Sequence, residues 1–131
     1  MKLLDTDTCI AILRGNAAVI ERRAATSDDV ATTWITAAEL YYGAAKSTAA
    51  AKNRALVTSF LATLPVLGLD EASAQIFGEA KALLERMGKR LADADLFIGA
   101  VAVAQSATVV TGNVRHYERI PGVTVENWMG D

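Results

Sequence analysis

Acidic and amide side chains stand at four points where the chain leaves or enters an apolar segment. Asp5 directly follows one apolar segment, Glu39 lies just after a second, Asp95 begins a third and Asn113 follows a fourth. Carboxylates that gather in one place ionise together only where a cation lies among them. Oxygen ligands without a histidine or thiol cluster suit Mg²⁺ or Mn²⁺ better than zinc. Such a site favours metal-assisted attack of water on a phosphodiester.

The elements that would position these residues alternate between strands and helices. The predicted strands cover residues 3–4, 30–35, 66–69, 108–111 and 123–125. The predicted helices cover residues 9–14, 17–25, 36–46, 49–64, 71–87 and 93–106. This alternation indicates a parallel sheet covered on both faces. We therefore expect a three-layer α/β/α domain with a central parallel sheet of four to five strands.

Ligands of open parallel sheets bind beyond the carboxyl ends of the strands. Asp5 and Asn113 follow predicted strands, while Glu39 and Asp95 lie in the first turns of helices beside them. The topology thus predicts that all four gather along one edge of the sheet as catalytic residues. Asp5, Glu39 and Asp95 are the predicted metal ligands.

Some of these residues also have a purely structural interpretation. Thr36 and Glu39 have the spacing of a capping box, although Gly43, one turn further on, leaves space beneath the Glu39 carboxylate. Asp93 and Asp95 would each stabilise a helix N-terminus electrostatically. Residues two apart on a helix point to nearly opposite sides, so both cannot face one ion. We expect Asp95 to face the site and Asp93 to accept a backbone hydrogen bond near the cap.

Length and composition indicate one folded domain over residues 1–131. Hydrophobic residues make up 52% of the chain and charged residues 21%, which excludes disorder. The net charge of -2 is unusual for a nucleic-acid-binding protein. Without the three charges of the predicted metal site, however, the remainder carries -2 + 3 = +1. Net charge therefore neither supports nor excludes RNA as a substrate.

The single cysteine and single histidine exclude several kinds of site. Cys9 lies among apolar neighbours and is expected to be a packed small hydrophobe, which leaves no disulfide or cysteine-based zinc cluster. His116 alone cannot perform a two-histidine acid–base mechanism, and we expect it to lie with Arg115 in a solvated turn. The absence of a signal segment and of a long apolar run predicts a cytoplasmic protein with no membrane contact.

Five segments, in order along the whole chain, carry a family resemblance. Residues 4–10 (LDTDTCI) resemble the L-D-T-[ND] start of PIN domains, and residues 36–43 (TAAELYYG) resemble their second motif. Residues 95–100 (DLFIGA) are similar to the D-x-x-I-A-A motif. Residues 110–113 (VTGN) and 121–128 (PGVTVENW) resemble the end of VapC-type PIN domains, the toxins of toxin–antitoxin pairs.

The resemblance implies a Mg²⁺- or Mn²⁺-dependent endoribonuclease with an RNA substrate, a cognate antitoxin and a homodimeric state. Asp7 stands where the family often has asparagine, and Asn113 where many members have a fourth acid. The second departure favours one tightly held ion over two. Thr111 is expected to support the site through its hydroxyl.

Two other interpretations remain open. Asp5 and Asp7 after a strand are similar to the D-x-D start of haloacid-dehalogenase-like phosphatases. That family expects threonine or valine where this chain has Cys9, and the later G-D-x-x-x-D pair is missing. A catalytically degenerate PIN scaffold that binds RNA or a protein partner is the non-enzymatic alternative, against which the retained acids argue.

Overall fold

A five-stranded, wholly parallel sheet organises the chain in a computed structural model that describes residues 1–130. The strand order is β3-β2-β1-β4-β5. The strands are β1 (Lys2–Leu4), β2 (Val30–Thr33), β3 (Val66–Leu67), β4 (Thr108–Val110) and β5 (Thr124–Glu126). The predicted α/β class and central parallel sheet are thus confirmed, with β1 in the middle of the sheet.

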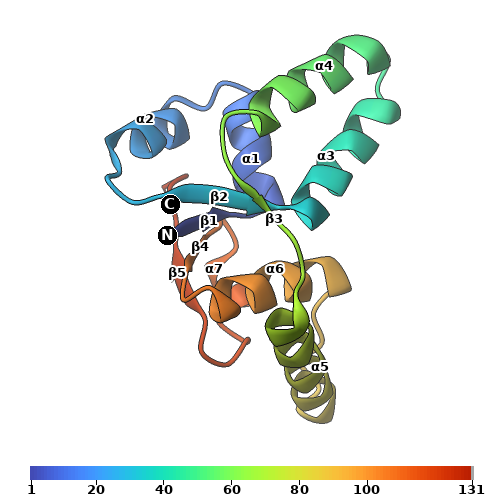
Figure 1. Ribbon diagram of the computed structural model, residues 1–131, viewed down its shortest axis with the longest axis vertical. Coiled ribbons are helices and arrows are strands. Elements are labelled where there is room, and N and C mark those ends of the chain that lie inside the picture. Colours follow the sequence, from blue (N-terminus) through green and yellow to red (C-terminus); the bar gives the residue numbers. More distant parts are fainter. Residues whose placement is uncertain (131) are drawn as a thin grey trace.

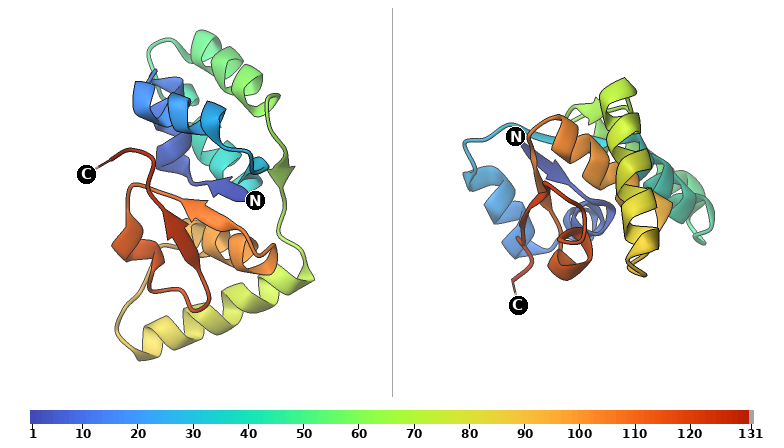
Figure 2. Two further views of the ribbon diagram at one scale, coloured as in Figure 1. Left: turned by 90° about the vertical axis from the view of Figure 1, so that its left-hand side faces the viewer. Right: turned by 90° about the horizontal axis from the view of Figure 1, so that it is seen from below.

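Helices cover both faces of this sheet and complete the three layers (Figure 1). One layer contains α1 (Thr6–Leu13), α2 (Ala17–Ala25), α3 (Trp34–Ala45) and α4 (Ala50–Leu61). The other contains α5 (Glu71–Arg86), α6 (Asp93–Ala104) and the short α7 (Val114–Tyr117). Figure 2 shows the sheet between the two layers from the side. Within residues 1–130, no helix is long and apolar enough to cross a membrane.

Successive residues of the central strands supply two separate hydrophobic cores. Leu3 and Val109 pack in the core beneath α5 and α6, whereas Leu4 and Val110 pack in the core beneath α1 to α4. Side chains of a strand alternate between the two faces of a sheet, so the residues of a strand that is buried on both faces are mainly apolar. The polar residue Asp5 therefore marks the point where β1 ends.

Helix α3 begins two residues earlier than predicted. The β-branched run up to Ile35 suggested a strand, but β2 ends at Thr33 and the helix starts at Trp34. Thr33 is the N-cap, and its hydroxyl accepts a hydrogen bond from the Thr36 N–H at 3.1 Å. The capping-box interpretation of Thr36 and Glu39 is therefore wrong, because the cap lies one turn nearer the strand.

Two close contacts hold the last part of the chain against the rest. A Cβ added to Gly99 on α6 would overlap Ile120 Cδ1, so the absence of a side chain there lets the segment after α7 pack directly on α6. A Cβ added to Gly112 would lie 2.6 Å from Met129 Cε. The C-terminal tail therefore returns to the loop that follows β4.

The cap of α3 yields a test of stability. Thr33→Ala should lower the free energy of unfolding by about 1–2 kcal/mol, because the buried Thr36 N–H loses its acceptor. Thr33→Ser keeps the accepting oxygen and serves as the matched control. Urea denaturation of the two variants measures the difference, and equal midpoints would refute the assignment of this cap.

Candidate active site

Asp5 connects the end of β1 to the start of α1. Its N–H donates to the Val110 carbonyl at 3.1 Å, and its Oδ1 accepts from the Thr8 N–H at 2.8 Å, which caps the helix. The side chain is 3% exposed. Burial raises the pKa of the Asp5 carboxyl, and hydrogen bonds from Thr111 and Thr8 offset part of that rise. Helix α1 thus begins three residues earlier than predicted, with Asp5 as its cap.

Glu39 lies on α3 and reaches the first turn of α1. The Thr6 hydroxyl donates to Glu39 Oε1 at 2.5 Å and lies 3.1 Å from the Thr36 hydroxyl. Thr6 follows Asp5 directly in the chain, so this contact brings the second predicted acid beside the first. The Glu39 carboxylate itself remains exposed at the sheet edge.

Asp95 is held by two side chains of α7. His116 Nε2 lies 2.9 Å from Asp95 Oδ2, and the Tyr117 hydroxyl donates to Asp95 Oδ1 at 3.2 Å. Tyr117 is buried, and about a quarter of the His116 side chain is exposed. The prediction that His116 lies in a solvated turn is therefore wrong. A four-residue helix inside a polar loop gave no periodic signal by which sequence reasoning could have found this contact.

Asp93 lies on the other side of α6 from the site. Its Oδ1 forms an ion pair with Lys81 Nζ of α5 at 3.0 Å. The N-cap of α6 is Ala92, and no side chain caps this helix end. The expected capping role of Asp93 is therefore wrong. Asp93 is instead the first helical residue, and it faces α5 while Asp95 faces α7. The expected divergence of the two carboxylates is confirmed.

Thr111 and Asn113 follow β4 at the same edge. Thr111 is fully buried, its hydroxyl accepts from the Asn113 N–H at 2.9 Å, and it lowers the pKa of Asp5. The expected supporting role of Thr111 at the site stays a prediction. The Asn113 carbonyl accepts from the N–H groups of His116 and Tyr117, but its exposed side chain forms no hydrogen bond with the described residues 1–130. Asn113 therefore shapes α7 through its backbone.

The negative charges of three acids affect the pKa of the buried Tyr117 hydroxyl. Burial raises the pKa of Tyr117 far above its ordinary value, and the charges of Asp5, Asp95 and Glu39 raise it further. All the donor atoms of these three carboxylates are hard oxygens of the kind that Mg²⁺ and Mn²⁺ prefer. Within residues 1–130, no three acidic, histidine or cysteine side chains converge closely enough to form a closed ligand cluster. The fit to a divalent ion therefore rests on the oxygen chemistry of the donors and not on a closed ligand cluster, and hydrogen bonds hold each acid at the edge.

Comparisons with known proteins agree with this geometry. Residues 2–122 match the PIN domain family. The chain belongs to the PIN-domain family. This membership decides against the haloacid-dehalogenase-like interpretation of Asp5 and Asp7.

Relatives of this PIN domain carry nuclease names. The chain is 38% identical over 127 residues to the tRNA(fMet)-specific endonuclease VapC of Salmonella typhimurium, covering 96% of each. It is 34% identical to ribonuclease VapC2 of Haemophilus influenzae, covering 97% of each. A crystal structure of DNA-bound VapBC from Salmonella typhimurium superposes with a TM-score of 0.91 at 37% identity, covering 97% of both chains. The predicted VapC-type family and the nuclease class of enzyme are confirmed.

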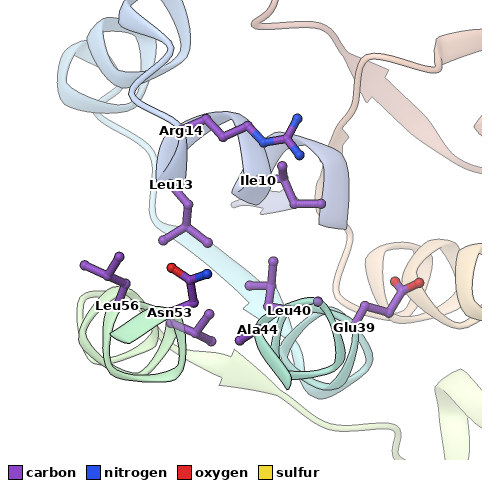
Figure 3. Close-up of a pocket in the computed structure, with 10 residues that line it drawn as sticks. Ile10, Leu13, Arg14, Glu39, Leu40, Ala44, Asn53 and Leu56 are labelled. Carbon is purple, nitrogen blue, oxygen red and sulfur yellow. The ribbon is translucent and has the colours of Figure 1, made fainter. Parts of the chain in front are cut away.

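A concave pocket opens beside Glu39 on this PIN domain. It encloses about 270 Å³ between α1, α3 and α4. Figure 3 shows Leu13 of α1 and Leu56 of α4 on opposite sides of it, with Glu39 of α3 at its rim. A Cβ on Gly43 would meet open space, as the glycine one turn after Glu39 suggested. Apolar walls thus adjoin the acidic edge.

The buried carboxylate of Asp5 should reduce stability at neutral pH. The pKa of Asp5 is raised in the folded chain, so ionisation of Asp5 at higher pH lowers the free energy of unfolding. This loss of stability disappears as the pH falls toward the ordinary pKa range of aspartate. Asp5→Asn cannot ionise, keeps an oxygen for the Thr8 N–H and gains a donor for Thr111. In chelator at pH 7 it should raise the thermal midpoint by about 2–5 °C.

The gain from Asp5→Asn should shrink between pH 7 and pH 4, which a series of thermal scans measures. Asp7→Asn, at an exposed position in the same helix, is the matched control and should give no such gain. A gain of equal size at both pH values would show that charge burial at Asp5 is not its cause.

Proposed function

We propose that this PIN domain is a Mg²⁺/Mn²⁺-dependent endoribonuclease that acts as the toxin of a toxin–antitoxin pair. The observation that carries the proposal is the placement of Asp5, Glu39 and Asp95 at the carboxyl edge of the sheet, where Thr6 links Glu39 to the residue after Asp5 and α7 holds Asp95. The names of its relatives support the same chemistry. The substrate is cytoplasmic RNA, and the tRNA named for the Salmonella relative is the first class to test.

The reaction is hydrolysis of a phosphodiester. The oxygen of water forms a bond to phosphorus, the bond from phosphorus to the leaving ribose oxygen breaks, and the departing oxygen takes up a proton. A divalent ion, when bound, supplies positive charge against the phosphate oxygens. Asp5 and Asp95 would hold it, with Glu39 as the third ligand at the exposed side.

Neighbouring hydroxyls prepare these acids for that role. Thr111 and the Thr8 N–H fix Asp5, Thr6 fixes Glu39, and Tyr117 fixes one oxygen of Asp95. None of these partners is a lysine or arginine that would compete with a cation for the carboxylate oxygens. Asn113 stands at the same edge and is proposed to act with them through the orientation of α7.

The two aspartates of α6 give a matched test of this site. Asp95→Asn should reduce RNA cleavage at saturating Mn²⁺ by at least about 100-fold, because a ligand for the ion is lost. Asp93→Asn should leave cleavage within about twofold, since Asp93 pairs with Lys81 at an exposed position. Cleavage rates on purified tRNA, together with thermal midpoints, measure both effects.

Excess chelator should also abolish cleavage by the unaltered chain. Cleavage that persists in chelator would refute the metal mechanism. An active Asp95→Asn enzyme would refute the assignment of that ligand. A folded chain that cleaves no RNA under any of these conditions would favour the degenerate scaffold.

We further propose that a cognate antitoxin occupies the pocket beside Glu39. The pocket has apolar walls for aliphatic or aromatic side chains, and the adjoining carboxylates suit an arginine or lysine of the same partner. Such a partner would exclude RNA from the edge without altering the fold. The homodimer implied by the family resemblance stays a prediction, for which light scattering of the purified chain is the measurement.

Leu56 provides the test of antitoxin binding. Leu56→Arg should retain toxicity on expression but resist neutralisation by the co-expressed antitoxin, because a charge enters the apolar wall of the pocket. Leu56 is 50% exposed, so the change should not unfold the chain. Ile20→Arg, at a 42% exposed position on α2 outside the pocket lining, is the control and should be neutralised normally. Equal neutralisation of both variants would place the antitoxin elsewhere.

A further inference from the structure

Tyr42 is exposed on α3 without a structural role there. It is the most exposed of the large hydrophobic side chains of residues 1–130, at 65%. Its neighbour Tyr41 packs against the core beneath α1 to α4, and the Tyr41 hydroxyl lies 2.8 Å from the Thr58 hydroxyl. The Tyr42 hydroxyl has no hydrogen-bond partner within the described residues. A single exposed ring is common on protein surfaces, so the neighbours of Tyr42 decide what it does.

Glu39, Tyr42 and Lys46 form a row along one side of α3 and its C-cap. They are three and four residues apart, which makes them neighbours on a helix surface. All three side chains are exposed, and the Lys46 ammonium lies 4.8 Å from the centre of the Tyr42 ring. At about 1.5 Å of rise per residue, the row covers about 10 Å. Because α3 extends outward from the carboxyl end of β2 (Figure 1), the row begins at the acidic edge and leads away from it.

The order of these side chains suits a single strand of RNA. Aromatic rings stack on unpaired bases, and lysines neutralise phosphates. The Lys46 ammonium covers one face of the Tyr42 ring, which leaves the opposite face for a base. No carboxylate of residues 1–130 lies within ion-pair distance of Lys46, so its charge is available to a phosphate.

Two features argue against a protein partner at this row. Lysine and glutamate are depleted from the cores of protein–protein interfaces, whereas this row is charged at both ends. Tyr42 and Lys46 also lie outside the lining of the pocket proposed for the antitoxin. An RNA strand that leaves the acidic edge along α3 would instead meet the ring and the ammonium in turn.

We infer that Tyr42 and Lys46 bind an unpaired segment of the RNA substrate beside the active site, with the Tyr42 ring stacked on a base and the Lys46 ammonium paired with an adjoining phosphate. The inference rests on the proposed ribonuclease function. Neither residue would touch the reacting phosphate, so both contribute to substrate binding and not to the chemical step. Loss of such a contact raises KM and leaves kcat unchanged.

Binding of RNA without cleavage gives the direct test. The full chain is titrated in excess chelator against a dye-labelled single-stranded RNA of about 12 nucleotides, a length within the usual range of site sizes, and fluorescence anisotropy measures Kd. Tyr42→Ala should raise Kd about 5- to 100-fold, which corresponds to the loss of one base–aromatic stack, whereas Tyr42→Phe keeps the ring and should stay within about twofold. Lys46→Gln should reduce the slope of log Kd against log salt concentration by about 0.7.

Two controls separate stacking from other roles. Trp34→Ala removes another exposed aromatic side chain of α3, 58% exposed and about two turns before Tyr42, and should leave Kd and KM unchanged. A probe of the same length that lacks bases should bind the unaltered chain and Tyr42→Ala equally, but should bind Lys46→Gln more weakly. In Mn²⁺, Tyr42→Ala should raise KM at unchanged kcat for an RNA that the unaltered chain cleaves. Thermal midpoints and light scattering measure the fold and the molar mass of each variant.

Tight binding of the single-stranded RNA by Tyr42→Ala would overturn the inference, and so would an equal loss of its binding to the base-free probe. If Tyr42→Ala and Trp34→Ala both lower the molar mass and weaken RNA binding alike, the row belongs to an interface between two copies, which overturns the inference as well. In each of these cases, cleavage by the unaltered chain in Mn²⁺ leaves the proposed function intact. A chain that cleaves no RNA would reject the proposed function itself, and the inference with it.

Discussion

The central position of β1 in a wholly parallel sheet is the constraint on which the site depends. Because β1 pairs with β2 on one side and β4 on the other, the carboxyl ends of all three strands meet at one edge. Leu3 and Leu4 of β1 are buried in the cores on its two faces, and Asp5 is the polar residue that directly follows them. A buried carboxylate at this point lowers the stability of the fold. The contributions of Thr8 and Thr111 make this loss smaller but do not remove it.

The acids of the site are held by hydroxyl, backbone N–H and imidazole groups, while the lysines and arginines that form ion pairs do so elsewhere. Within residues 1–130, no lysine or arginine forms an ion pair with Asp5, Glu39 or Asp95. Lys2 and Arg22 both pair with Glu126, and Lys81 pairs with Asp93. An arginine beside Asp5 or Asp95 would neutralise the carboxylate and compete with a metal ion. Threonine and tyrosine hydroxyls orient the same oxygens and leave their charge in place.

Sequence reasoning was reliable where a physical pattern extends over many residues. The alternation of apolar strands with amphipathic helices specified the parallel sheet, and helical geometry alone separated Asp95 from Asp93. It failed where structure depends on one local hydrogen bond. Helix α3 starts earlier than predicted because Thr33 caps it. A β-branched run is equally compatible with a strand and with a helix that begins at such a cap. The His116 contact required a four-residue helix and joins residues that lie 21 apart in the chain.

The return of the C-terminal tail gives the two chain ends different surroundings. Met129 lies against Gly112 and, with Asp7 and Arg14, lines a hollow beside the acidic edge. Met1 lies at the opposite edge, where its carbonyl accepts from the Thr108 N–H at the amino end of β4. A polyhistidine tag or fused domain attached after Gly130 would thus bring foreign imidazoles and bulk to the side of the acidic edge. The same addition before Met1 would project from the far side of the sheet, which makes the amino end the suitable point of attachment for a purification handle.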